Sequence, residues 1–154
     1  MPSERIKEYL NSHRINYSVI PHSKAFTSQE IAASAHISGN EFAKTVMIKV
    51  DGQLAMAVLP ASYKINFRIL SDIVGSKNVE LASEEEFRFR FPDCEVGAMP
   101  PFGNLWNMNV YVSERLAYNN DIVFNAGLHT ELIRMAYSDF EQLVRPRVVN
   151  YSIA

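Results

Sequence analysis

The sequence predicts an α+β domain whose mixed, largely antiparallel, curved sheet (a partial barrel) is flanked by helices. The first observation is a pair of apolar segments, 45–50 and 54–59, on either side of Asp51-Gly52, a dipeptide that favours a tight hairpin turn. The second is that segments with helical spacing of apolar residues alternate with short strand-like segments. The length of 154 residues fits a single domain over 1–154.

In the first half of the chain, Ile6, Tyr9 and Leu10 predict an amphipathic helix over 3–13, and a short strand is expected over 17–20. Thr27-Ser28-Gln29-Glu30 has the pattern of a capping box and predicts a helix that ends before Gly39. After the hairpin, Pro60 should end the second strand because proline has no amide hydrogen for the ladder. Further on, Asn66 should cap a helix that contains Phe67, Leu70 and Val74 and ends at Gly75.

In the second half, Ser83 with Glu86 predicts another capping box, and Ser138 with Glu141 a third, which opens a closing helix that stops before Pro146. The alternating segment 87–91 fits a strand as well as a helix end. A loop rich in glycine, proline and aromatic residues is expected over 95–107, and strands over 110–112, 122–124 and 130–135.

Composition limits the function classes. Fifteen basic and seventeen acidic residues give a formal charge of −2, whereas proteins that grip long nucleic acids usually carry a basic surplus. Any RNA contact should therefore be small and local. No apolar run approaches the ~20 residues that cross a bilayer, the N-terminus lacks a signal pattern, and one cysteine allows no internal disulfide. We expect a cytoplasmic protein that does not enter membranes.

Lys44 is the first candidate for chemistry because it lies where a buried strand begins. A strand fixes the backbone, so the ammonium group is aimed better than on a loose loop, and it could hold a phosphate or a developing oxyanion. A solvated strand-end lysine would produce the same local pattern.

The second candidate is the loop Gly97-Ala98-Met99-Pro100-Pro101-Phe102-Gly103. Its prolines fix φ, and its glycines allow backbone conformations that other residues avoid. Such a loop can hold N–H groups ready for a bound oxygen. The alternative is a rigid connector between two elements.

His129 follows a glycine turn in Asn125-Ala126-Gly127-Leu128-His129, where it could contact substrate, act as an acid or base, or cap the turn. Cys94 lacks an obvious base, and its neighbours Asp93 and Glu95 would raise a thiol pKa, so we interpret it as structural. The other histidines show no metal-ligand spacing and no phosphate-binding glycine fingerprint occurs, so we expect no metal and no cofactor.

Three segments in this order, 41–45, 96–103 and 125–129, resemble the family of YbaK and prolyl-tRNA-synthetase-associated editing domains. His22, the 26–30 helix start and Ala57-Val58-Leu59-Pro60 are also similar, and the resemblance runs from about Tyr17 to Pro146. It implies an aminoacyl-tRNA deacylase that acts on the 3′ aminoacyl end of mischarged tRNA, with prolyl-tRNA synthetase as a further partner.

The resemblance maps the key lysine of the family onto Lys44, its Gly-x-x-x-Pro loop onto Gly97 and Pro101, and its late histidine onto His129. One subgroup, which clears alanyl-tRNA, has asparagine after the lysine, whereas Thr45 here is closer to the branch that clears cysteinyl-tRNA. The expected catalytic residues are Lys44, Gly97 and His129, and the expected substrate contacts are Thr45, Ala98, Met99, Pro100, Pro101, Phe102 and Gly127.

The implied hydrolysis needs no metal and no protein nucleophile, because an aminoacyl ester beside a free ribose hydroxyl is already reactive. Lys44 would hold the terminal phosphate or the oxyanion, and amides near Gly97 would orient the carbonyl. Met99, Pro100 and Phe102 would sort amino acids by size. A non-catalytic module that binds aminoacyl-tRNA or a synthetase is the alternative function, and an unrelated small-molecule esterase is another.

Overall fold

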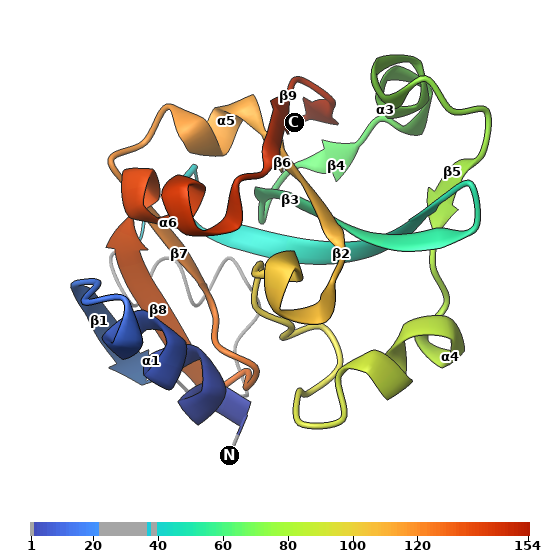
Figure 1. The fold of residues 1–154 in the computed structure, drawn as a ribbon. Coiled ribbons are helices and arrows are strands. Elements are labelled where there is room, and N and C mark those ends of the chain that lie inside the picture. The colour runs from blue at the N-terminus through green and yellow to red at the C-terminus, as the bar shows by residue number, and fades with distance from the viewer. Residues whose placement is uncertain (1, 22–36, 38–39) are drawn as a thin grey trace.

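The computed structural model describes residues 2–21, 37 and 40–154, and it has the predicted α+β class. In Figure 1, β2 and β3 cross the middle of the molecule, with the β1, β7 and β8 strands on one side and α3, β5 and α4 on the other. In chain order the elements are α1 (Pro2–Ser12), β1 (Tyr17–Pro21), β2 (Ala43–Val50), β3 (Gln53–Pro60), β4 (Lys64–Ile65), α3 (Phe67–Val74), β5 (Val79–Leu81), α4 (Glu84–Phe87), η1 (Arg88–Arg90), η2 (Gly103–Trp106), β6 (Asn109–Ser113), α5 (Glu114–Ala117), β7 (Asp121–Asn125), β8 (Glu131–Ala136), α6 (Tyr137–Val144), β9 (Arg147–Val149) and β10 (Ser152–Ile153).

The described strands form three hydrogen-bonded sheets rather than one curved sheet. The largest has the order β5-β2-β3-β6-β9, in which β3, β6 and β9 are parallel neighbours and β2 is antiparallel to both β3 and β5. A second, antiparallel sheet has the order β1-β8-β7, and β10 pairs with β4 in a third. The mixed character is as predicted.

The hairpin between β2 and β3 forms as the sequence predicts. Asp51 and Gly52 have φ angles of 52° and 82°, the left-handed values that a tight two-residue turn requires. This turn sets the register in which Lys44 lies opposite Leu59. Because β3 is buried over most of its length, the pair forms a rigid centre for the fold.

Helix α3 also begins and ends at the predicted residues. The Asn66 side chain accepts a hydrogen bond from the Ile69 amide at 3.1 Å, and Gly75 closes the helix with a φ of 71°. The Ser83–Glu86 capping box is present as well, and residues 87–91 continue from α4 into a 3-10 turn, so the helical alternative is correct there.

The predicted third capping box is wrong. Helix α6 begins at Tyr137 with Ala136 as its N-cap, and no side chain caps it. Ser138 therefore lies inside the first turn, because β8 extends to Ala136 and the helix begins two residues earlier than the box requires. The predicted helix at Thr27-Ser28-Gln29-Glu30 lies outside the described residues. Several short elements (β4, β5, α5, β9 and β10) were not predicted from the sequence.

The main core lies between the two larger sheets, beneath α1 and α6. Phe102 is at its centre, with ring centroids 5.4 Å from Phe124 and 5.5 Å from Phe140. Tyr151 fills a second cluster on the other side of β3. Its hydroxyl lies 2.7 Å from the Tyr111 carbonyl oxygen and 3.0 Å from that of Val58, to which it donates. Among the described residues, no helix has the length and apolarity needed to cross a bilayer.

Replacing Tyr151 by phenylalanine should destabilise the protein by about 1–3 kcal/mol, because the buried carbonyls of Tyr111 and Val58 lose the single hydroxyl hydrogen that they share. Urea unfolding followed by circular dichroism measures this loss. The matched control is Tyr118→Phe, since Tyr118 is 75% exposed, and it should leave the midpoint almost unchanged. Equal midpoints for both variants would mean that the Tyr151 hydroxyl contributes no stability.

Candidate active site

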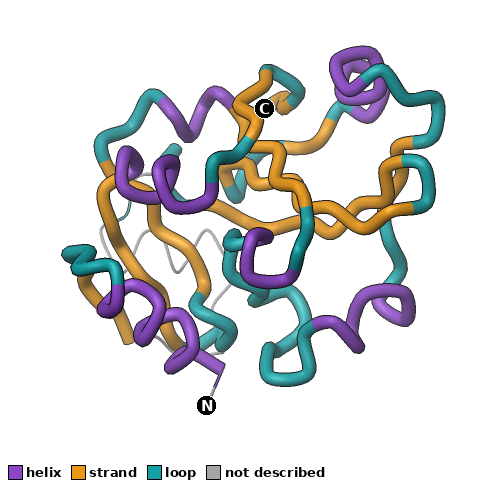
Figure 2. The backbone as a smooth tube through the Cα atoms, in the orientation of Figure 1, coloured by secondary structure: helices purple, strands orange, loops and turns teal. Residues whose placement is uncertain are grey.

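The structure brings two of the three predicted catalytic residues into contact. Gly97 lies between η1 and η2, and a Cβ atom built on it would be 3.5 Å from Cε1 of His129 and 3.7 Å from Nε2. Figure 2 shows the connections between the helices and strands in teal. The φ angle of Gly97 is 83°, so this position favours glycine, as the sequence argument assumed. The late glycine turn and the mid-chain loop therefore form one local unit.

Backbone hydrogen bonds hold this unit together. The Glu95 amide donates to the Gly127 carbonyl at 2.8 Å, and the Gly127 amide donates to the Ala98 carbonyl at 2.9 Å. The Glu95 side chain accepts a further bond from the His129 amide at 3.0 Å. Because each segment supplies both donors and acceptors, the two loops fix one another's position.

The His129 ring fixes the orientation of a particular peptide. Its Nε2 atom lies 2.7 Å from the Val96 carbonyl oxygen. A carbonyl can only accept, so Nε2 carries the hydrogen and donates it. In a trans peptide the N–H points away from the C=O, and the Gly97 amide therefore points away from His129. Within the described part of the chain this amide makes no hydrogen bond, which leaves it free for a ligand oxygen.

A contact between the two larger sheets lies two residues before Lys44 on one side and a few residues before the glycine turn on the other. Phe42 and Val123 form a parallel bridge, and the Val123 amide donates to the Glu41 carbonyl at 2.9 Å. Two residues further along both chains stand Lys44 in β2 and Asn125 in β7. Asn125 comes directly before the turn that contains Gly127 and His129, so the bridge sets Lys44 beside the strand from which this turn begins.

The electrostatics around Lys44 are unusual for a surface lysine. Burial lowers the pKa of Lys44 below its usual range, and the nearby positive charge of Lys64 lowers it further. Within the described residues neither lysine forms a salt bridge or hydrogen bond. Lys7 and Lys49, in contrast, pair with carboxylates.

The predicted substrate contacts divide into two groups. Thr45 follows Lys44 on β2, so the side chains of these two residues point to opposite faces of the strand. Residues 98–102 are buried, and Ala98, Met99 and Phe102 belong to the main core. They hold the loop from beneath, whereas Val96, at 48% exposure, and Gly97 form its exposed part.

Asn125 is a polar residue at the site that the sequence argument did not single out. Its Oδ1 atom is buried and has no hydrogen-bond partner. A buried acceptor without a donor is unfavourable, so a donor from water or from a bound group would be stabilising at this position. The signal in the sequence was its position at the start of the Asn125–His129 segment, directly before the glycine turn.

Cys94 is half-buried, and its thiol is a weak nucleophile because it stays protonated at neutral pH. Burial, together with the smaller effect of the Asp93 charge, raises the pKa of its thiol to about 11, and the positive charge of Arg5 partly opposes this rise. The sequence argument predicted this direction from the acidic neighbour, but burial is the larger cause. Among the described residues, no three histidine, cysteine or acidic side chains are grouped as metal ligands would be.

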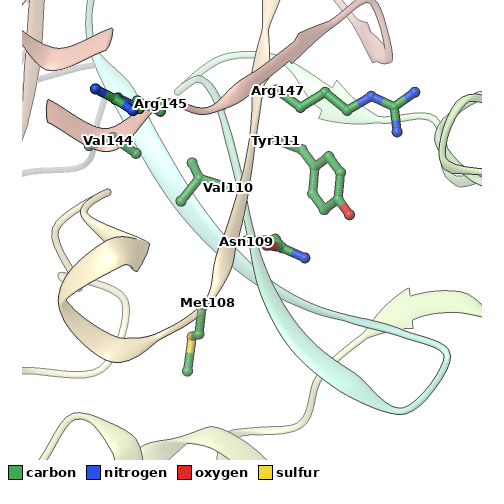
Figure 3. Close-up of a pocket in the computed structure, with 7 residues that line it drawn as sticks. All are labelled: Met108, Asn109, Val110, Tyr111, Val144, Arg145 and Arg147. Carbon is green, nitrogen blue, oxygen red and sulfur yellow. The ribbon is translucent and has the colours of Figure 1, made fainter. Parts of the chain in front are cut away.

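The structure also contains a pocket that the sequence did not predict. It has a volume of about 310 Å³ and opens at the part of β6 that β9 does not cover, between β6 and the end of α6. Figure 3 shows Arg145 and Arg147 on different sides of β6, and the Arg147 guanidinium donates to the Ile73 carbonyl at 2.9 Å. The pocket is lined by Met108, Asn109, Val110, Tyr111, Val144, Arg145 and Arg147, none of which is a predicted site residue.

A family model described as an aminoacyl-tRNA editing domain matches residues 22–143, which contain all the predicted site residues. The chain belongs to the aminoacyl-tRNA editing domain family. It is 23% identical to the multifunctional Ser/Thr-tRNA deacylase ProXp-y of Escherichia coli K12, over 96% of this chain and 91% of that protein. It is 28% identical to the proline–tRNA ligase of Bacillus mycoides KBAB4 over 58% of this chain, a match that spans only 16% of the ligase.

Solved structures share the fold. A candidate trans-editing enzyme for prolyl tRNA synthetase superimposes with a TM-score of 0.85 at 16% identity, over 99% of this chain and 98% of that one. The hypothetical protein APE2540 gives a TM-score of 0.85 at 19% identity, over 97% and 99% of the two chains. At these identities the likeness establishes the α+β architecture of the domain.

The hydrogen bond from His129 to Val96 generates a prediction for the loop. His129→Leu should leave the fold intact but increase amide hydrogen exchange of Ala98, whose amide donates to the Glu95 carbonyl at 3.0 Å within this loop, because the ring then no longer holds the Val96 carbonyl. His129→Gln keeps an N–H donor on a side chain of similar reach, so it should restore part of the protection. Unchanged exchange in His129→Leu would show that the ring does not hold the loop.

The raised pKa of Cys94 generates a second prediction. At pH 7–8, well below a pKa of about 11, nearly all of the thiol is protonated, so iodoacetamide should alkylate the folded protein far more slowly than the urea-unfolded chain. The rate should increase as the pH approaches 11. Alkylation at pH 7.5 as fast in the folded as in the unfolded protein would contradict the protonated, half-buried thiol.

Proposed function

We propose that the protein is an aminoacyl-tRNA deacylase that hydrolyses the ester of a small amino acid wrongly attached to tRNA. The observation that carries this proposal is the Val96–Gly97 peptide, whose N–H is held outward and free by the His129 ring. A preorganised backbone donor of this kind stabilises the oxyanion of acyl transfer. Membership of the editing-domain family supplies the substrate class.

In the proposed mechanism, each group of the site has a separate task. The Gly97 amide binds the ester carbonyl oxygen, and the Lys44 ammonium stabilises the negative charge that develops as water adds. The ribose hydroxyl beside the ester orients the water, accepts its proton and passes its own hydrogen to the ribose oxygen that leaves when the ester C–O bond breaks. The products are the free amino acid and the tRNA with its terminal hydroxyl, and the protein supplies neither a nucleophile nor a metal. His129 acts as a positioning residue, because its Nε2–H is already committed to Val96.

The remaining predicted contacts shape the site. Ala98, Met99 and Phe102 fix the loop through the core, and Pro100 and Pro101 limit its conformations. Gly127 joins the loop to the turn through its amide and carbonyl, both of which are hydrogen-bonded. The proposal gives the size limit for the amino acid to the exposed part of the loop at Val96 and Gly97, which Met99 and Pro100 support from beneath.

A second hydrolytic site has a thermodynamic reason. A synthetase pocket separates amino acids that differ by one methylene by only ~1–3 kcal/mol, so errors between small amino acids need separate removal. The E. coli relative is named for Ser and Thr, whereas Thr45 after Lys44 favours the cysteinyl branch. Serine, threonine and cysteine are therefore the amino acids to test first. Matches to proline–tRNA ligases make prolyl-tRNA synthetase the proposed partner.

Replacing Lys44 by alanine should lower kcat/KM for deacylation by about 10²–10³, the usual cost of losing one preorganised charge-stabilising group. The measurement is hydrolysis of tRNAs charged with serine, threonine, cysteine or alanine, with and without EDTA. Lys77→Ala, a change of the same charge at an exposed position, should retain normal activity. Circular dichroism confirms that both variants fold.

Near-normal turnover by Lys44→Ala would remove Lys44 from the mechanism. Tight binding of mischarged tRNA without turnover by the unmodified protein would favour a binding module. Cleavage of simple esters alone would favour a small-molecule esterase.

A further inference from the structure

We infer that Lys64, next to Lys44, forms a phosphate subsite. This subsite binds the 5′-phosphate of the terminal adenosine of the tRNA. The inference rests on the proposed function. It assigns phosphate binding and oxyanion stabilisation, the two electrostatic tasks of that function, to two different lysines. Lys64 would hold the phosphate, and Lys44 would be left to stabilise the charge on the ester carbonyl. Both targets are attached to the same ribose.

The backbone places Lys64 at the same end of the central sheet as Lys44. Lys44 is paired with Leu59, one residue before β3 ends at Pro60. The chain then turns back, with the Ala61 amide donating to the Phe42 carbonyl at 2.8 Å and the Tyr63 amide to the Pro60 carbonyl at 2.9 Å. This turn places Ala61, three residues before Lys64, beside Phe42, two residues before Lys44.

Strand β4 is itself held firmly. It pairs with β10 in the register Lys64↔Ile153 and Ile65↔Ser152, and the Asn66 amide donates to the Tyr151 carbonyl at 2.9 Å. Ile65 packs against the core cluster that contains Tyr151. Successive side chains of a strand point in opposite directions, so Lys64 faces solvent, where it is exposed.

The ammonium groups of Lys44 and Lys64 lie close enough for one charge to act on the other, so together they raise the local positive potential. Like charges repel, and the field of Lys64 already lowers the pKa of Lys44. No described acidic side chain pairs with either. In a protein with a formal charge of −2, such a local positive site is suited to an anion, and an RNA phosphate is the anion that accompanies every aminoacyl ester of tRNA.

The phosphate can be tested separately from the ester. The substrates are 3′-O-aminoacyl adenosine with and without a 5′-phosphate, and the measured quantity is the ratio of their kcat/KM values. A charge-assisted contact should make this ratio about 10 or more in the unmodified protein. Lys64→Ala should bring the ratio close to 1, Lys64→Arg should restore most of it, and the charge-matched control Lys77→Ala should leave it unchanged.

A second measurement does not depend on catalysis. Calorimetry or NMR compares the affinity of the protein for adenosine 5′-phosphate, adenosine and inorganic phosphate. The nucleotide should bind about tenfold more tightly than adenosine or inorganic phosphate, and Lys64→Ala should abolish the gain over adenosine. This holds even if no mischarged tRNA is hydrolysed, so a failure of the proposed function is distinguishable from a failure of the subsite.

Three outcomes would overturn the inference. One is an unchanged phosphate ratio in Lys64→Ala, and another is an equal loss on both adenosine substrates, which would mean that Lys64 acts only on the structure or on Lys44. The third is binding of inorganic phosphate as tight as that of the nucleotide, which would mark an unspecific anion site.

Discussion

The parallel contact between the start of β2 and β7 is the constraint on which the candidate site depends. It consists of the Phe42–Val123 bridge and the hydrogen bond from the Val123 amide to Glu41. Arg134 on β8 reinforces it through salt bridges to Glu41 at 3.0 Å and Asp121 at 3.4 Å. Without this contact, the sheet that contains Lys44 and the sheet that leads to His129 would have no fixed relation near the site.

A second level of order is the mutual support of two loops. Residues 95–98 and 126–129 satisfy each other's backbone groups, and the His129 ring then selects the orientation of one peptide. The glycines of this region serve different purposes. Gly97 is needed for its φ of 83°, whereas Gly103 is needed for space, because a Cβ there would lie 2.5 Å from Val110 Cγ2 and 2.7 Å from the Met108 carbonyl oxygen.

The parts of the fold that could be predicted from the sequence are those governed by local interactions. The Asp51-Gly52 turn, the Asn66 cap and the Gly75 terminus each depend on residues within four positions of one another. The short strands β4, β5, β9 and β10 could not be predicted, because each is defined by a distant partner rather than by its own pattern. The capping box predicted at Ser138 was wrong for a related reason. Pairing of β8 with β7 and β1 extends the strand and shifts the start of α6.

The candidate site divides in the same way. Lys44, Gly97 and His129 could be selected from residue type and order, but the direction of the Gly97 amide depends on a contact across 33 residues of sequence. Asn125 and Lys64 were missed because an unpartnered oxygen and an uncompensated charge are properties of three-dimensional surroundings. The sequence pattern can name such residues only after the neighbours are known.

The attachment of β4 to β10 links the far end of the chain to the electrostatics near Lys44. Tyr151 and β10 hold the backbone of β4, the strand that contains Lys64. Sequence changes among the last few residues could therefore tune how strongly an RNA end is retained while the hydrolytic groups stay untouched. Residues of β10 would then affect how long the substrate stays bound without affecting the rate at which the ester bond is cleaved.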